Sequence, residues 1–303
     1  MNCFEAGLGS NLCSALSFSP EGRGNGKKLG TLIYDMHTHI FPPKIAEKAT
    51  GAIGAFYGIS MSRRGFADDL VASGASIGVA KYLVCSTATT PMQVTAINSF
   101  ISSEAAKHPE FIGFGSLHPG FEDIPAETDR IIALGLRGIK LHPDFQKFAI
   151  DDREAFPIYE AAEGRLPVLF HTGDKRYGFS NPDKVLRVLR NFPRLKVICA
   201  HLGGYSEWDN VLSLKKYLGN PNIYIDTSSA IQFMEPAKAA EMIKKHGVER
   251  VFWGTDYRCG NTKPNSRTSS ACRSRTTRRK RYLAGTPRRF SPKHKTIISF
   301  FPN

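Results

Sequence analysis

The stretch that decides the fold is LIYDMHTH, residues 32–39. Its mixture of β-branched, aromatic and apolar residues is typical of a buried β-strand. In a strand, residues two apart point to the same side, so His37 and His39 are predicted to face one side together. The stretch therefore predicts a strand whose end presents two imidazoles.

Seven further short apolar runs follow this strand, and amphipathic segments separate them. Their spacing after the first interval is about 30 residues, the length of one βα unit. The runs are AKYLVCS (80–86), FIGFGSLH (111–118), GIKLH (138–142), PVLFH (167–171), KVICAH (196–201), NIYIDTS (222–228) and RVFWGTD (250–256). The predicted helices span 91–107, 123–135, 152–164, 182–191, 207–218 and 236–246. Continuous apolar strands indicate that both sheet faces are covered, so residues 29–257 are predicted to form one α/β domain, a (β/α)8 TIM barrel.

Every predicted strand ends on a polar residue. These residues are His39, Ser86, His118, His142, His171, His201, Ser228 and Asp256. In such a barrel they collect at the carboxyl ends of the strands, where active sites lie. The longest interval, about 40–79, contains Tyr57, Arg63 and Arg64 and is the natural candidate for a lid or substrate-binding insertion.

Two imidazoles on one rigid face make half of a metal site. Alone, such a pair is more often structural or a coincidence. The strand-end residues His171, His201 and Asp256 change this balance, because barrel closure would bring them to the same mouth as His37 and His39. The residues thus point to a metal centre at the mouth of the barrel.

The ordered set of strand-end motifs resembles the amidohydrolase superfamily, and within it the amidohydrolase-2 branch that includes aminocarboxymuconate-semialdehyde decarboxylase. The matching text is DMHTH (35–39), GIKLHP (138–143), LPVLFHTG (166–173), VICAHLGG (197–204) and FWGTDY (252–257). The resemblance covers about residues 31–257. It is specific for the superfamily and much less specific for the substrate.

The resemblance implies one divalent metal ion, usually zinc, held by His37, His39, His171 and Asp256, with His201 as a catalytic residue beside it. Three neutral imidazoles and a carboxylate suit zinc, which lowers the pKa of bound water to roughly 7. Asp256 would take the proton of that water and His201 would stabilise charge on the substrate oxygen. The alternative is that His201 only forms hydrogen bonds to the metal ligands and takes no part in the reaction.

Other polar residues give weaker signals. His142, Arg63, Arg64 and Arg176 are candidates to contact a small-molecule substrate, including one that carries a carboxylate, although a solvated loop is the default for Arg176 and its neighbours. Lys140 precedes His142 by two residues. Some superfamily members carboxylate a lysine on this strand to bridge two metals, but a structural lysine is the simpler expectation here.

The two ends of the chain differ from the body. Residues 1–28 are rich in Gly, Ser and Asn and are predicted to be a disordered extension. Residues 258–303 hold 13 Lys or Arg and no Asp or Glu, which leaves 28 basic and 27 acidic residues in the rest of the chain. A one-base shift restores a family-like ending to this tail, so we interpret 258–303 as a frameshift product that lacks the eighth helix.

Because most of the net charge of +14 comes from residues 258–303, this charge says little about binding partners. We expect no nucleic-acid partner and no membrane partner, and the oligomeric state stays open. Six cysteines without a CxxC pair predict free thiols, with Cys85 and Cys199 buried, in a reducing cytoplasm.

Two enzymatic functions fit this sequence. The first is a metal-dependent hydrolase of a small ester, lactone or amide. The second is a metal-dependent non-oxidative decarboxylase of an aromatic or unsaturated acid on the same scaffold. A basic nucleic-acid-binding protein is a third, disfavoured interpretation, because the tail has few aromatic residues for stacking.

Overall fold

The structure is a computed structural model that describes residues 32–61, 63–75 and 77–257. The predictions for residues 1–28 and 258–303, including the frameshift and the missing eighth helix, lie outside these residues. Among the described helices, none is long and apolar enough to cross a membrane.

The predicted strands all form, and neighbouring strands are parallel. They are β1 (Ile33–His39), β2 (Val79–Cys85), β3 (Phe111–Gly113), β4 (Gly115–Ser116), β5 (Ile139–Leu141), β6 (Val168–Phe170), β7 (Val197–Cys199), β8 (Ile223–Asp226) and β9 (Val251–Phe252). The predicted strand 111–118 is divided at Phe114. Its first part pairs with β2 and its second part with β5, so one strand position holds two short elements.

Backbone hydrogen bonds join the strands into a closed barrel. Phe114 lies between β3 and β4, and its N–H donates to the carbonyl oxygen of Val84 on β2 at 2.9 Å. This bond joins the sheet that contains β2 to the sheet that begins with β4. On the other side, the N–H of Met36 donates to Trp253 at 2.9 Å and that of Asp256 donates to His37 at 2.9 Å. This second seam joins β1 to the last strand, as the isolated bridge between Thr38 and Tyr257 also shows. The predicted eight-stranded α/β barrel is confirmed.

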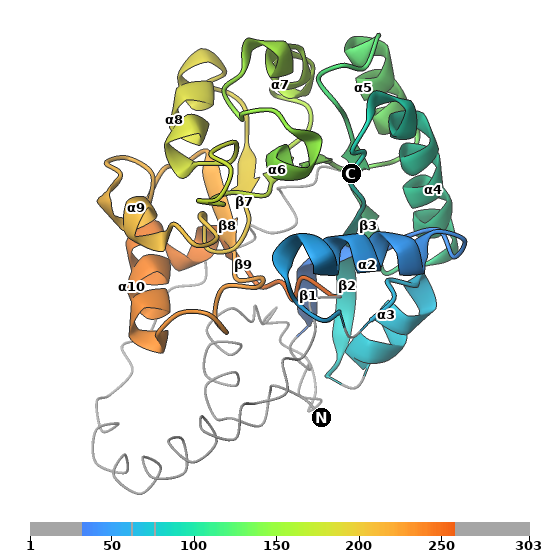
Figure 1. Ribbon diagram of the computed structural model, residues 1–303, viewed down its shortest axis with the longest axis horizontal. Helices are drawn as coiled ribbons and strands as arrows, with labels where there is room; N and C mark the ends of the chain where they lie inside the picture. The colour runs from blue at the N-terminus through green and yellow to red at the C-terminus, as the bar shows by residue number, and fades with distance from the viewer. Residues whose placement is uncertain (1–31, 62, 76, 258–303) are drawn as a thin grey trace, which may run out of the picture.

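The helices surround these strands (Figure 1). They are α2 (Ala46–Tyr57), α3 (Ala67–Ala75), α4 (Val94–Lys107), α5 (Ile124–Ala133), α6 (Pro143–Gln146), α7 (Phe156–Ala162), α8 (Pro182–Asn191), α9 (Trp208–Ser213) and α10 (Pro236–His246), with short 3-10 turns η1 (Pro91–Gln93), η2 (Arg153–Ala155) and η3 (Val248–Arg250). The long interval after β1 folds into α2 and α3. The predicted helix 207–218 stops at Ser213, because Leu214 adopts an extended conformation with a ψ of 115°.

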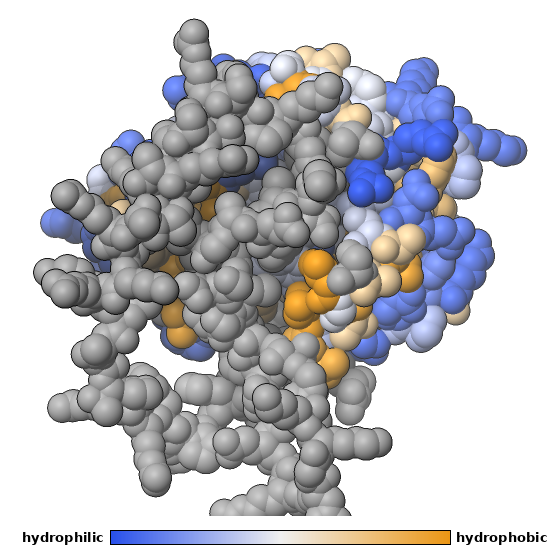
Figure 2. All heavy atoms as spheres, turned by 90° about the horizontal axis from the view of Figure 1, so that it is seen from below, coloured by the Kyte–Doolittle hydropathy of each residue, from blue (hydrophilic) through white to orange (hydrophobic). Residues whose placement is uncertain are grey.

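Alternate residues of the strands divide between two buried clusters. Val168 and Phe170 belong to the larger cluster that also includes helix residues, whereas Leu169 between them belongs to a smaller cluster built from strand residues. Both sheet faces are therefore covered, as the apolar strands predict. Cys85 and Cys199 are buried free thiols. Hydrophilic side chains cover much of the described outer surface that Figure 2 shows.

Two glycines bring the loops after β6 and β7 into contact. Gly173 has a φ of 78°, and a Cβ atom placed on it would lie 2.5 Å from the Cα of Gly204. No real Cβ contact is that short, so this approach requires glycine at position 173. His171 lies two residues before Gly173 and His201 three residues before Gly204, so the contact fixes the distance between the two histidine-bearing loops.

Gly173→Ala should therefore destabilise the protein more than the same change at Gly135. Gly135 has a similar φ of 75°, but a Cβ atom placed on it would meet no other atom within 4 Å, so it isolates the cost of the backbone conformation. We expect about 1 kcal/mol for Gly135→Ala and about 3 kcal/mol or more for Gly173→Ala. Urea unfolding of both variants measures the difference, and equal losses would contradict the proposed clash.

His246 ties α10 to the start of β8. Its Nε2 donates to the carbonyl oxygen of Ile223 at 3.0 Å, and its Nδ1 accepts from the N–H of Gly219 at 3.3 Å. Burial, with the nearby charge of Arg250, lowers the pKa of His246 from 6.5 to about 4. The neutral imidazole is therefore the form that belongs to the folded state.

This lowered pKa predicts a pH-dependent contribution to stability. Between the unfolded pKa of 6.5 and the folded pKa of about 4, the unfolded chain binds more protons, so stability is full above pH 6.5 and falls as the pH falls. At pH 5 the loss from this group amounts to about 2 kcal/mol. The free-energy difference between wild type and His246→Gln should shrink by that amount from pH 7 to pH 5. A difference that is constant with pH would refute the assignment.

Candidate metal centre and active-site cavity

Three of the residues expected to bind metal form a compact group. His37 and His39 lie on β1, and Asp256 follows β9 across the barrel seam. One ligand atom from each lies within 4.8 Å of the others. The Nε2 atoms of His37 and His39 are 3.1 Å apart, and Nε2 of His39 is 3.3 Å from Oδ1 of Asp256. The seam thus brings together residues from the two ends of the barrel sequence.

A buried carboxylate orients His37. Nδ1 of His37 lies 2.8 Å from Oδ2 of Asp226, whose side chain is completely buried at the end of β8. Burial opposes ionisation of Asp226, but the attraction of the neighbouring imidazoles and hydrogen bonds from His37 and Ser228 lower its pKa. An ionised carboxylate only accepts, so Nδ1 of His37 carries the hydrogen and Nε2 presents a lone pair. A carboxylate behind an imidazole in this way is typical of metal-ligating histidines.

His201 is held by the loop that follows β8. Its Nδ1 donates to the carbonyl oxygen of Ser228 at 2.8 Å, so the lone pair lies on Nε2. Nε2 is 3.0 Å from Nδ1 of His171. His201 and Asp256 have φ values of 61° and 52°, a conformation that side chains other than glycine rarely adopt. Such strain collects at functional sites, where the surrounding contacts maintain it.

His171 lies in the same cavity but outside the compact group. Its Nδ1 is engaged with His201, while its Nε2 lies 3.8 Å from Oδ2 of Asp144. Its ligand atoms lie instead within 4.8 Å of those of Asp144 and Asp174. The structure therefore gathers three of the four expected ligands and leaves His171 as a neighbour of this group.

Burial determines the charges in this region. It lowers the pKa of His171 and of His142 well below the usual value, so both are neutral imidazoles. Burial also opposes ionisation of Asp256, but the hydrogen bond from His39 and the electrostatic attraction of the surrounding imidazoles hold its pKa well below the usual value. Neutral imidazoles and an ionised carboxylate are the protonation states that a metal requires of its ligands.

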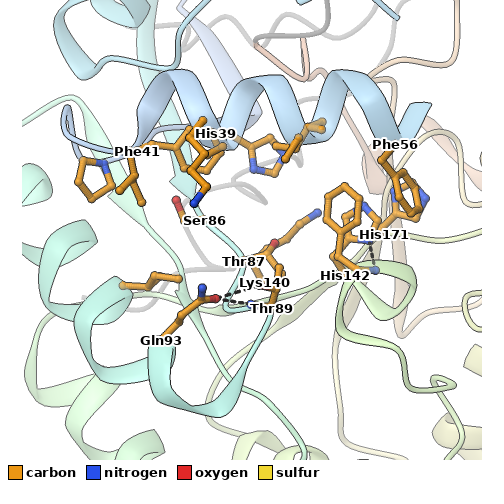
Figure 3. A pocket seen from close by; sticks show the side chains of 18 of the residues that line it. His39, Phe41, Phe56, Ser86, Thr87, Thr89, Gln93, Lys140, His142 and His171 are labelled. Atoms are coloured by element: carbon orange, nitrogen blue, oxygen red, sulfur yellow. Dashed lines mark hydrogen bonds between the residues drawn. The ribbon is translucent and has the colours of Figure 1, made fainter. Parts of the chain in front are cut away.

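The histidines line a cavity of about 690 Å³ beneath α2 (Figure 3). Its polar lining includes His142, Lys140 and Tyr57. The Tyr57 hydroxyl lies 3.0 Å from Nε2 of His142, and Nζ of Lys140 lies 3.4 Å from Nε2 of His37. Lys140 is 1% exposed, so this lysine belongs to the floor of the cavity. The long interval after β1 thus supplies the roof of the site through α2.

The expected substrate-binding arginines lie elsewhere. Arg63 and Arg64 line a separate depression on the other side of α2, and Nη1 of Arg64 is 3.2 Å from Glu47. Arg176 is not among the residues that line the cavity. It binds Asp174 through Nε at 2.9 Å and Nη2 at 2.7 Å, and donates from Nη1 to the carbonyl oxygen of Phe56 at 2.8 Å. The guanidinium thus attaches the end of α2 to the loop after β6.

Sequence reasoning missed Asp226 and underrated Lys140. The available signal for Asp226 was a carboxylate in the otherwise apolar strand text IYID, residues 223–226. Such a buried acid requires a partner, and the partner here is His37. For Lys140, the corresponding signal was a lysine flanked by Ile139 and Leu141 in a fully buried strand.

A family model for amidohydrolases, Amidohydro_2, matches residues 34–289, more than half of the 303-residue chain. The match continues past residue 257 into the basic segment. Among solved structures, a protein from Staphylococcus aureus assigned as an amidohydrolase is 16% identical, with a TM-score of 0.55 over 74% of this chain and 88% of that one. An amidohydrolase from Burkholderia multivorans, solved with bound zinc, is 13% identical, with a TM-score of 0.51 over 80% of this chain and 90% of that one.

At these identities the solved structures support the fold alone. The family match spans the strand that bears His37 and His39, the loops that bear His171 and His201, and the segment that bears Asp256. The chain therefore belongs to the amidohydrolase family.

Proposed function

We propose that this protein is a metal-dependent hydrolase in which water attacks an ester, lactone or amide. The observation that carries the proposal is the compact group of His37, His39 and Asp256, with the lone pair of His37 Nε2 fixed by Asp226, at the floor of a closed-barrel cavity. Buried imidazole nitrogens and an ionised carboxylate are ligands that fit a divalent cation.

His37, His39 and Asp256 would hold the ion, with His171 as a fourth ligand from the neighbouring wall. Zinc is the metal we propose, because imidazole nitrogens and a carboxylate are among its preferred ligands. The Burkholderia multivorans relative, which contains zinc, supports this choice. When bound, such an ion supplies Lewis acidity that lowers the pKa of water to roughly 7.

The remaining chemistry belongs to residues of the chain. Asp256 stays ionised and accepts the proton of the attacking water. His201 is the second proton acceptor. Its Nδ1 is committed to the Ser228 carbonyl, so the lone pair lies on Nε2, 3.0 Å from Nδ1 of His171, and it would become available to a proton if His171 turned to the ion. In this tautomer Nε2 carries no hydrogen, so His201 is suited to accept a proton. It cannot donate a hydrogen bond from Nε2 to the substrate oxygen, which is the role expected from the sequence. Lys140, at the cavity floor, supplies a hydrogen-bond donor for that oxygen.

The decarboxylase alternative depends on a cation that binds the substrate carboxylate. Among the described residues that line the cavity, the lysines are Lys48 and Lys140, and Lys140 is the one beside the histidines. A screen that pairs lactones and esters with aromatic and unsaturated carboxylic acids separates the two reactions, because release of carbon dioxide marks only the second.

Substitution of the proposed ligands should remove metal and turnover together. His37→Ala and Asp256→Ala should purify without stoichiometric zinc, because each deletes a donor of the compact group. His201→Gln should retain zinc while turnover falls by about 10²–10⁴-fold, as for loss of a general base. Metal analysis by mass spectrometry and rates on the best substrate of the screen measure both effects. Full activity of the metal-free protein would refute the proposal.

Asp226→Asn should weaken zinc binding by about 10–100-fold, because the His37 imidazole loses its charged hydrogen-bond acceptor. Competition against a chelator of known affinity measures the change. His246→Gln is a suitable control, because His246 contacts the opposite end of the same strand. Unchanged zinc affinity in Asp226→Asn would show that the carboxylate has no part in holding the metal.

A further inference from the structure

The cavity above the metal centre has a mostly apolar lining. Its roof is one face of α2, formed by Ile45, just before the helix, and by Ala49, Ala52, Ile53 and Phe56. These positions recur with the spacing of one helix face. The volume of about 690 Å³ is within the range of roughly 300–1,000 Å³ typical of pockets for small organic ligands.

The roof strip is distinct from the face of α2 that packs against the protein. The buried positions of the helix are Ala46, Thr50 and Gly54. Thr50 donates to the carbonyl oxygen of Arg64, and Gly54 lies against Met61. α2 therefore has two apolar faces, and among the described residues only the Ala46, Thr50 and Gly54 face is packed against the rest of the protein. An apolar helix face over an open cavity is unfavourable in water unless a ligand covers it.

The opposite wall comes from η1 and α4 and is also apolar, with Met92, Ala96 and Ile97. Met92 is 90% exposed. Polar groups on this side are already engaged, since Oε1 of Gln93 accepts from the N–H of Thr89 at 2.8 Å and from its hydroxyl at 3.0 Å (Figure 3). The alanines at 49, 52 and 96 keep space open between the two walls.

The two ends of the cavity differ. At the histidine end, the last turn of α2 is attached by the bond between Tyr57 and His142 and by the bond from Arg176 to Phe56. At the other end, the side chains are exposed, with Ile45 at 48% and Met92 at 90%. The open rim therefore includes large apolar side chains, the exposed Lys48 also lines the cavity, and the closed end carries the reacting groups.

We propose that the substrate carries an extended apolar group, such as an unbranched acyl or alkyl chain, that lies between α2 and α4 while its ester or lactone group faces His37 and Asp256. This inference rests on the proposed hydrolase function for the position of the reacting group. The apolar subsite itself rests on the lining of the two walls. It differs from the expectation of a small substrate, because acetyl-sized groups would leave the α2 strip uncovered.

Calorimetric titration of the metal-loaded protein with butyrate, hexanoate, octanoate and decanoate tests the subsite without turnover. The carboxylate is constant in this series, so affinity should rise about fourfold with each added methylene until the cavity is filled. Ala52→Trp fills the cavity from the roof and Ala96→Trp fills it from the opposite wall. Each should weaken decanoate binding at least tenfold and leave butyrate binding within about twofold of wild type.

Ala55→Trp is the matched control, because Ala55 lies on the same helix and lines the separate depression near Arg63. It should bind decanoate as wild type does. Two variants from different walls guard against a folding defect in one, and circular dichroism verifies the fold of each. Equal affinity for butyrate and decanoate, or decanoate binding that neither cavity variant weakens, would overturn the proposal.

Hydrolysis of γ-lactones with increasing alkyl side chains then separates this inference from the proposed function. Chain-dependent decanoate binding with no hydrolysis of any lactone or ester would retain the subsite and reject the hydrolase. Hydrolysis whose kcat/KM is independent of chain length, together with chain-independent binding, would retain the hydrolase and reject the subsite. If the hydrolase function and the apolar subsite are both correct, kcat/KM should rise with chain length in wild type and in Ala55→Trp, but not in Ala52→Trp.

Discussion

The hydrogen bonds that close the barrel between β1 and the segment after β9 are the constraint on which the site depends. The N–H of Asp256 donates to the carbonyl oxygen of His37, so two residues from opposite ends of the barrel sequence share one backbone contact. Thr255 adds a second connection, because its N–H and hydroxyl donate to the carboxylate of Asp35 at 3.0 and 2.6 Å. With the seam closed, the His37, His39 and Asp256 side chains have little freedom to separate.

Holding these polar groups away from water requires compensation elsewhere. Asp226 is completely buried, and its carboxylate accepts from His37, from the N–H of His201 and from Ser228. The same carboxylate therefore orients a proposed ligand and a proposed base. The unusual backbone conformation of His201 is maintained by the bond from its N–H to Asp226 and by the glycine contact between the neighbouring loops, and that of Asp256 by the bond from its N–H to His37.

The fold and most of the site residues could be predicted from the sequence, because strand periodicity and strand-end histidines are local signals. The division of the third strand at Phe114 could not, since it arises from pairing with two different neighbours. The placement of Arg176 and of Arg63 likewise depends on α2, a helix that the pattern of residues 40–79 did not predict. The position of Lys140 beside His37 could not be predicted either, because it depends on which side chains of β5 point into the closed barrel.

The separation of the two faces of α2 has a consequence for how this enzyme could change over evolutionary time. The Ala46, Thr50 and Gly54 face anchors the helix, whereas the Ile45, Ala49 and Ala52 face contributes to the cavity. Mutations on the second face alter the shape offered to a ligand while the strands that carry the histidines keep their packing. Substrate preference can therefore diverge among descendants of this sequence at little cost to folding, with the chemistry inherited unchanged.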